Sequence, residues 1–136
     1  MDKDGYGKEI CITNLPSIQK PSFANFTQSM LRQLCILSGC DYVSSLSGLG
    51  IKTAHSLIKK HKSVDKVLQA IKSSRTYDIP NNYEELVYKA ELTFLHQRVF
   101  DHTQNQVLPL TPLPTDLDIE NTDFLGPYAY ILNNRI

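Results

Sequence analysis

Two neighbouring stretches of the sequence hold residue types that could do chemistry. In the first, Asp41 follows an apolar run and a glycine in Ser38-Gly39-Cys40-Asp41-Tyr42. This pattern predicts that Asp41 lies at the C-terminal end of a helix, where the helix dipole disfavours an anion. A cation, a metal ion or the amides of the next turn must compensate. Asp41 is therefore either a metal ligand or the cap of the following turn.

The second stretch is Gly48-Leu49-Gly50, followed by Ile51-Lys52-Thr53-Ala54. Glycines allow a positive φ and let a ligand approach the backbone closely. Free amides at the start of the next helix favour a phosphate, and Lys52 and Thr53 add a charge and a hydroxyl donor. A helix–hairpin–helix grips one DNA backbone in this way without reading bases. The alternative is an ordinary tight turn.

Helices must position both motifs. Apolar residues at helical spacing predict four helices, over about 22–38, over 51–61, from 63 and from 81. Ser22 and Ser63 are the expected caps, and Asn81 with Glu84 resembles a capping box. The side chains expected to face inward are Phe23, Phe26, Met30, Leu34, Leu37, Ala54, Leu57, Ile58, Val64, Val67, Leu68, Ile71, Tyr83, Val87, Ala90 and Phe94.

The rest of the chain is expected to hold little regular structure. Residues 9–13 favour a short strand, and residues 97–100 and 106–108 favour a small hairpin. From residue 109 prolines and acids predict an extended tail, with residues 124–127 as its apolar anchor. The expected fold class is mainly α, with a short N-terminal strand, a small hairpin and an extended C-terminal tail.

Composition narrows the class of protein. The chain has 136 residues, 41% hydrophobic and 21% charged, which fits one globular domain at most and excludes a disordered chain or a disulfide knot. No apolar run is long enough to span a membrane, and no secretory signal is visible. The odd number of cysteines, Cys11, Cys35 and Cys40, favours buried reduced thiols of an intracellular protein over a disulfide. The four histidines lack zinc spacing and are interpreted as surface or helix residues.

A net charge of zero conceals a basic segment. Residues 51–75 carry seven basic residues and the single acid Asp65, a net charge of +6 that the rest of the chain balances. Such a block favours a polyanionic partner, or else a solvated helical face. Its basic residues are Lys52, Lys59, Lys60, Lys62, Lys66, Lys72 and Arg75.

With these motifs in view, the sequence resembles the flap endonuclease and exonuclease 1 group of 5′ nucleases. The resemblance rests on residues 34–42 and 48–54 together, and it covers nearly the whole chain. Residues 94–101, 108–110 and 124–127 are closer to exonuclease 1, whereas residues 51–53 are nearer the flap endonuclease pattern. The resemblance implies that residues 1–108 are the C-terminal portion of a 5′ nuclease domain. It also implies a helix–two-turn–helix region, a helix–hairpin–helix of type 2, over 22–75, and a tail over 109–136.

The resemblance also implies metal chemistry. Family members cut DNA with two divalent metal ions, here Mg²⁺, held by a cluster of carboxylates of which only Asp41 has a match in this chain. The fragment alone is therefore expected to be inactive. A potassium ion is implied at Ser38, Ser45 and Leu49, through a hydroxyl or backbone carbonyls. The residues expected to bind DNA are Gly48, Gly50, Lys52, Thr53, Lys59 and Lys60.

The leading interpretation is thus a fragment of a 5′→3′ structure-specific DNA exonuclease or flap endonuclease. Its partner would be duplex DNA with a 5′ end or flap, it would not bind membranes, and it would be a monomer that can meet repair proteins. The resemblance implies DNA repair, including mismatch repair, in the nucleus. One alternative is a stand-alone, non-catalytic helix–hairpin–helix module that binds DNA. Another is a helical protein-interaction domain with a merely solvated basic face.

Overall fold

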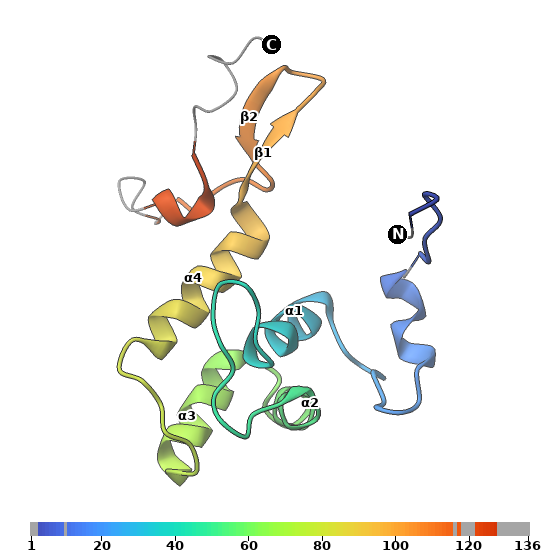
Figure 1. The fold of residues 1–136 in the computed structure, drawn as a ribbon. Coiled ribbons are helices and arrows are strands. Elements are labelled where there is room, and N and C mark those ends of the chain that lie inside the picture. The colour runs from blue at the N-terminus through green and yellow to red at the C-terminus, as the bar shows by residue number, and fades with distance from the viewer. Residues whose placement is uncertain (1–2, 10, 116, 118–121, 128–136) are drawn as a thin grey trace. The chain divides into compact units, whose positions relative to one another are not determined.

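The computed structural model describes residues 3–9, 11–115, 117 and 122–127, and Figure 1 traces its elements in order. The predicted mainly α fold is confirmed. The described elements are η1 (Ile12–Ser17), α1 (Gln28–Leu37), α2 (Ile51–His61), α3 (Val64–Ser74), α4 (Tyr83–His96), β1 (Arg98–Asp101), β2 (Gln106–Pro109) and η3 (Asp123–Leu125). Among these, no helix is long and apolar enough to cross a membrane.

The chain divides into two compact units. The first comprises Met1–Cys40 and Ser44–Ile79, and the second comprises Asp41–Val43 and Pro80–Ile136. In the first unit α1, α2 and α3 pack on one another, because each presents one apolar face. Its fully buried side chains include Leu34, Leu49, Ile58 and Val67. The basic segment and the two-glycine motif therefore belong to one small helical core.

Helix α1 begins later than the sequence predicted. Thr27 is its cap and accepts a hydrogen bond from the Met30 amide at 3.2 Å, so the predicted start at Ser22 is wrong. Asn25 has a φ of +63°, which interrupts any helical run from Ser22. The predicted end is confirmed, because α1 stops at Leu37 and Gly39 takes a φ of +98°.

The next two helices follow the prediction closely. Helix α2 spans Ile51–His61 as expected, with Ala54 and Ile58 fully buried and Leu57 half-buried. The Ser63 hydroxyl caps α3 by accepting a hydrogen bond from the Lys66 amide at 3.5 Å. The four apolar side chains expected to face inward from α3 are all buried. Local periodicity was sufficient here because both helices pack through a single stripe.

The N-terminal segment departs from the prediction. The strand expected over residues 9–13 is wrong: Ile12–Ser17 is a 3-10 helix, while Ile10 lies outside the described residues. Its turns are local, as in the Asn14 amide donating to the Cys11 carbonyl at 3.0 Å. The described residues offer this segment no partner strand, and a lone strand leaves its backbone groups unpaired.

The second unit is built on α4 and a hairpin. The predicted capping box is wrong, because Asn82 rather than Asn81 precedes the helix and makes no side-chain cap. Tyr83, Val87 and Ala90 are buried as expected, whereas Phe94 is 38% exposed. The predicted hairpin is confirmed, with β1 and β2 antiparallel and Val99 opposite Leu108.

Two groups of side-chain contacts stabilise the turn of the hairpin and the described tail residues Thr122–Gly126. Asp101 accepts hydrogen bonds from the Thr103 hydroxyl at 2.6 Å and the Thr103 amide at 2.8 Å, and these bonds lower the pKa of Asp101. The Arg98 guanidinium donates to the Gly126 carbonyl and, at 2.7 Å, to the Thr122 hydroxyl. With Leu125 buried, the predicted apolar anchor of the tail is confirmed over its described residues.

The cysteines are free thiols, but they are not buried as predicted. Cys11 and Cys35 are exposed and Cys40 is partly exposed. Desolvation and the neighbouring Cys40 raise the pKa of Cys35, which favours its thiol over the thiolate. Cys35 faces outward because the buried stripe of α1 is formed by Met30, Leu34 and Leu37.

Candidate nucleic-acid interface

The segment between α1 and α2 contains two glycines, Gly39 and Gly48, that both take a positive φ. At Gly39 the φ is +98°, which L side chains rarely adopt, and an added Cβ would also lie 3.2 Å from the Ser45 backbone nitrogen, a tight contact. At Gly48 the φ of +80° is the requirement, because an L side chain is strained there. Gly39 therefore lies against Ser45, and the turn at Gly48 leads the chain into α2.

Leu49 anchors the second turn to the core. Its side chain is fully buried, and its amide donates to the Leu46 carbonyl at 2.9 Å, which closes a β-turn with Gly48 at the third position. Gly50 follows with a φ of −80° and a ψ of 178°, which is extended backbone. Of the two properties for which glycine was expected here, a positive φ is therefore used at Gly48 and not at Gly50, which leaves close approach of a ligand as the reason for Gly50.

Gly50 has no reason within its own unit to be a glycine. Its backbone suits any residue, and an added Cβ would meet no atom within 4 Å. It is the cap of α2 but carries no side-chain oxygen, whereas Thr27 and Ser63 cap α1 and α3. By helix geometry the amides of Ile51–Thr53 have no intrahelical acceptor. Gly50, Ile51 and Lys52 are exposed, so a ligand can approach this end of α2.

The charge at this end of α2 is unusual. The first turn of α2 holds Lys52 and no acid, while α3 carries Asp65 in its first turn. A lysine beside the positive end of a helix dipole is repelled unless an anion is present. We call residues Gly48–Thr53 the glycine turn: it combines open amides, a helix dipole and a lysine, which together favour a phosphate.

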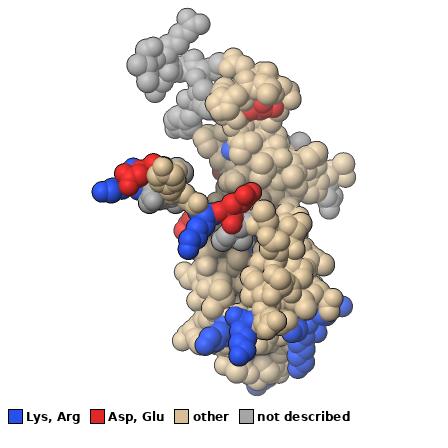
Figure 2. Space-filling model, turned by 90° about the vertical axis from the view of Figure 1, so that its right-hand side faces the viewer, with Lys and Arg blue, Asp and Glu red and all other residues tan. Residues whose placement is uncertain are grey.

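The remaining basic residues extend this positive surface along α2 and α3. All seven basic side chains predicted for the segment are exposed. Lys59 and Lys60 lie in the last turn of α2, Lys62 caps it with a φ of +70°, and Lys72 lies in the last turn of α3. Figure 2 shows Lys and Arg gathered over the end of the first unit that holds α2 and α3. Both DNA-binding lysines predicted at the far end of α2 are thus accessible.

Asp41 is placed in the second unit, directly after the end of α1. The carboxylate is exposed, and within the described residues it has no hydrogen bond or ion pair, so no cap of the following turn is formed there. Nor does the described part of the chain contain three or more His, Cys, Asp or Glu side chains grouped to hold a metal ion. One carboxylate does not fit a two-metal centre by itself. The predicted metal role of Asp41 stays a prediction.

The predicted potassium ligands lie in the first unit. The Ser38 hydroxyl donates to the Cys35 carbonyl at 2.9 Å and keeps lone pairs that could face a cation. Ser45 is exposed beside Gly39, and Leu49 is fixed by its buried side chain. Gly39, which follows Ser38, lies close to Ser45. Joint coordination of an ion by the three residues remains a prediction.

Sequence reasoning missed a buried histidine next to the glycine turn. His55 is 7% exposed in α2, and its ring contacts Phe23 and Phe26, which were expected to face inward from the helix predicted over 22–38. His96 is equally buried in α4, where its ring nitrogen Nδ1 lies 2.8 Å from the Thr111 hydroxyl. Both lie in helices, as one interpretation of the histidines had it, but neither is on the surface. The apolar flanks of His55, Ala54 and Ile58, were the available signal.

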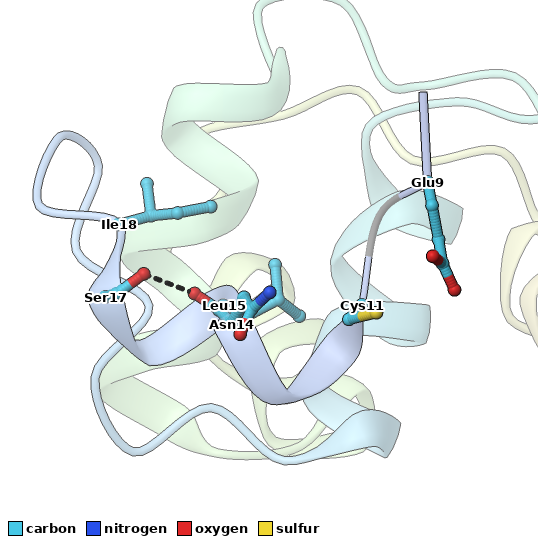
Figure 3. A pocket seen from close by; sticks show the side chains of 6 residues that line it. All are labelled: Glu9, Cys11, Asn14, Leu15, Ser17 and Ile18. Carbon is cyan, nitrogen blue, oxygen red and sulfur yellow. Dashed lines mark hydrogen bonds between the residues drawn. The ribbon is translucent and has the colours of Figure 1, made fainter. Parts of the chain in front are cut away.

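A separate shallow pocket lies on the N-terminal segment. It has a volume of about 210 Å³ and is formed by one short stretch of chain around η1. In Figure 3 the Ser17 hydroxyl donates to the Asn14 carbonyl, 2.6 Å away, and Glu9 is set apart from the others. Its lining residues are Glu9, Cys11, Asn14, Leu15, Ser17 and Ile18. One carboxylate and one thiol make no constellation for catalysis, so the glycine turn is the stronger candidate.

Comparison with known proteins gives the relatives of the chain. No protein-family model matches it. The chain is 45% identical to exonuclease 1 of Arabidopsis thaliana and 42% identical to exonuclease 1 of Oryza sativa subsp. japonica, over 93% and 94% of this chain. It is 43% identical to flap endonuclease 1 of Candida albicans over 60 residues, 43% of the chain.

These alignments cover only part of each relative. They account for 17% and 15% of the two exonuclease 1 proteins and 16% of the flap endonuclease, so the chain spans about a sixth of the length of the curated relatives it matches. The two exonuclease matches nevertheless run through α1, the glycine turn and α4, because they cover more than nine tenths of this chain. The chain therefore belongs to the exonuclease 1 and flap endonuclease 1 family and matches one segment of these nucleases.

Proposed function

We propose that this chain is part of a structure-specific 5′→3′ DNA exonuclease or flap endonuclease, and that its task is to grip the backbone of duplex DNA. One observation carries the proposal: Gly50 is an unstrained, unhindered glycine at the start of a helix whose first turn holds a lysine and no acid. A phosphate that approaches Gly50 accounts for the glycine, the uncapped amides and Lys52 together. The names of the relatives supply the class of substrate and reaction.

In this proposal the glycine turn and the lysines at the far end of α2 contact different phosphates. The amides of the first turn of α2 donate to one phosphate, with Lys52 and the Thr53 hydroxyl beside them. Lys59 and Lys60 lie at the other end of α2, roughly 12 Å along its axis at about 1.5 Å per residue. They would contact a different phosphate on the same duplex. Such contacts carry no base information, so binding should not depend on sequence.

Asp41 would supply one carboxylate to a divalent-metal site in the complete nuclease. Oxygen ligands are what Mg²⁺ prefers, and the exposed Asp41 carboxylate is free to take such a role. When bound, paired metal ions activate a water and stabilise the leaving oxygen of the phosphodiester. The described residues contain no group of three or more His, Cys, Asp or Glu side chains that could hold such a pair, and we expect the 136-residue chain by itself not to cleave DNA.

Further parts of the proposal follow from the family. Potassium would bind at Ser38, Ser45 and Leu49 and bridge the protein to a phosphate. The favoured substrate would be duplex DNA with a 5′ end or flap. The complete protein would act as a monomer in DNA repair, including mismatch repair, in the nucleus, where it can meet repair proteins.

Salt dependence of duplex binding tests the proposal. Each phosphate neutralised contributes about −0.9 to the slope of log affinity against log salt, so two to four contacts predict a slope of roughly −2 to −4. Lys52→Ala should make the slope less steep by about 1. Lys89→Ala is the matched control, because Lys89 lies in the second unit and pairs with Glu85 at 2.7 Å. No binding at low salt, or binding independent of salt, would support the solvated basic face instead.

The absence of grouped ligands in the described residues also suits the alternative of a stand-alone, non-catalytic DNA-binding module. Cleavage of a 5′-flap duplex in Mg²⁺ by the complete gene product separates the two. The nuclease proposal requires cleavage that is lost in Asp41→Ala. The non-catalytic module requires none.

A further inference from the structure

His55 is a buried side chain that ties the first half of α2 to another part of the chain. Its Nε2 lies 2.9 Å from the Ser22 carbonyl oxygen. Its ring is stacked on Phe26 at 4.9 Å and 7°, and it meets Phe23 edge-on at 5.1 Å. All three contacts go to residues 22–26, the segment that precedes α1. None of these groups belongs to the proposed DNA contacts.

The hydrogen bond fixes the tautomer and gives the contact a direction. A carbonyl oxygen can only accept, so the Nε2 of His55 carries a hydrogen and donates a hydrogen bond to the Ser22 carbonyl oxygen. The apolar side chains around it, Ala54 and Ile58, are fully buried and favour burial of this face of α2. Apolar contact is non-directional, however, so it tolerates a small roll or slide of the helix. The hydrogen bond from His55 tolerates such a movement less well, because a hydrogen bond weakens as its donor–hydrogen–acceptor angle departs from linear.

The position of His55 makes this restraint relevant to the glycine turn. His55 is four residues after Ile51, hence about 6 Å along the axis from the first helical amide, at 1.5 Å per residue. A roll of α2 that broke the His55 bond would turn the amides of Ile51–Thr53 by the same angle. Leu49 anchors the other side of the turn through its buried side chain. The uncapped amides are therefore held between a buried leucine and a buried histidine.

We propose that His55 is a positioning residue for phosphate binding: its bond to the Ser22 carbonyl holds the first turn of α2 in the orientation in which its amides meet a DNA phosphate. This inference rests on the proposed function of the glycine turn. His55 itself touches no DNA. It acts through the backbone of Ile51–Thr53.

The test compares two substitutions in the 136-residue chain. His55→Phe keeps a ring between Phe23 and Phe26 but removes the donor, whereas His55→Gln keeps an N–H donor at a similar reach and removes the ring. Binding to a blunt DNA duplex is measured by fluorescence anisotropy at one fixed salt concentration. Thermal unfolding of each variant is measured first, and binding is then measured at a temperature at which every variant is folded. We expect His55→Phe to bind about fivefold more weakly, and His55→Gln to recover most of that loss.

His96→Phe is the matched control, because His96 is the other 7% exposed histidine, bonded to Thr111 in the second unit. It should lower the melting temperature and leave duplex affinity unchanged. Amide chemical shifts supply a second measurement. The changes in amide chemical shift that duplex DNA causes at Gly48–Thr53 should be smaller in His55→Phe than in the unmodified chain. The changes at the α3 lysines should be the same in both.

The outcomes separate the two proposals. If the unmodified chain binds no duplex at low salt, the function proposed for the glycine turn fails. If it binds and His55→Phe binds equally well when folded, only the role of His55 fails. A loss in His55→Gln as large as in His55→Phe would also overturn the inference, because retaining the donor would then have no effect. If His55→Phe does not fold, His55→Gln decides alone: near-normal affinity and normal Gly48–Thr53 shifts support the role, and their loss refutes it.

Discussion

Replacing Gly50 with serine separates phosphate binding from folding at a single position. The backbone at Gly50 is already that of a helix cap, with a φ of −80° and a ψ of 178°, and a new Cβ would meet open space. Serine is among the best residues at a cap, and its hydroxyl would accept a hydrogen bond from an amide of the first turn. The substitution therefore satisfies inside the protein a donor that we assign to DNA.

The two expected effects have opposite signs. Serine in place of glycine at a cap gains a few tenths of a kcal/mol of folding free energy, which for a chain of this length raises the melting temperature by roughly 1 °C. Loss of one amide bond to a charged phosphate oxygen costs about 1.5 kcal/mol or more, hence at least about tenfold in affinity. We expect Gly50→Ser to be slightly more stable than the unmodified chain and to bind duplex at least about tenfold more weakly.

Thermal unfolding and fluorescence anisotropy with a DNA duplex measure the two effects. Thr27→Ala is the control at another helix start: it removes the α1 cap, should cost about 1 kcal/mol of stability and should leave duplex affinity unchanged. Equal duplex affinity of Gly50→Ser and the unmodified chain would refute the assignment of the phosphate to the start of α2. A large drop in stability would instead refute the open surroundings of Gly50.

Three further predictions concern other residues. Asp41→Ala in the complete nuclease should reduce cleavage of a 5′-flap duplex by orders of magnitude and leave binding nearly intact; an equal loss of binding would contradict a metal role. Leu49→Ala removes a fully buried side chain and should lower the free energy of unfolding in urea by about 2–5 kcal/mol. Hydrogen bonds from Thr103 lower the pKa of Asp101 in the fold, so its stabilising contribution is present above the unfolded pKa of about 3.9 and is lost as pH falls through the folded value. The melting temperature of Asp101→Asn should therefore fall less than that of the unmodified chain between pH 5 and pH 3.

Local pattern determined the helices that carry the site. The ends of α2, the Ser63 cap of α3 and the stop of α1 at Gly39 were all predicted from the sequence, because each depends on neighbours within a few residues. The two-glycine motif and its lysine also predict a phosphate site, which stays a prediction. The family resemblance was likewise contained in the sequence, since it rests on residue identities rather than on packing.

Only the tertiary structure decided how those residues are used. It moved the start of α1 from Ser22 to Gln28, because Asn25 turns the chain and Phe23 and Phe26 pack on His55 instead of continuing the helix. It also separated three glycines: Gly39 and Gly48 both take a positive φ, Gly39 in addition lies close to Ser45, and Gly50 has an ordinary φ and open space around it. The sequence alone does not show for which of these reasons a position is glycine. The reason depends on atoms that arrive from distant parts of the chain, and only folding brings them together.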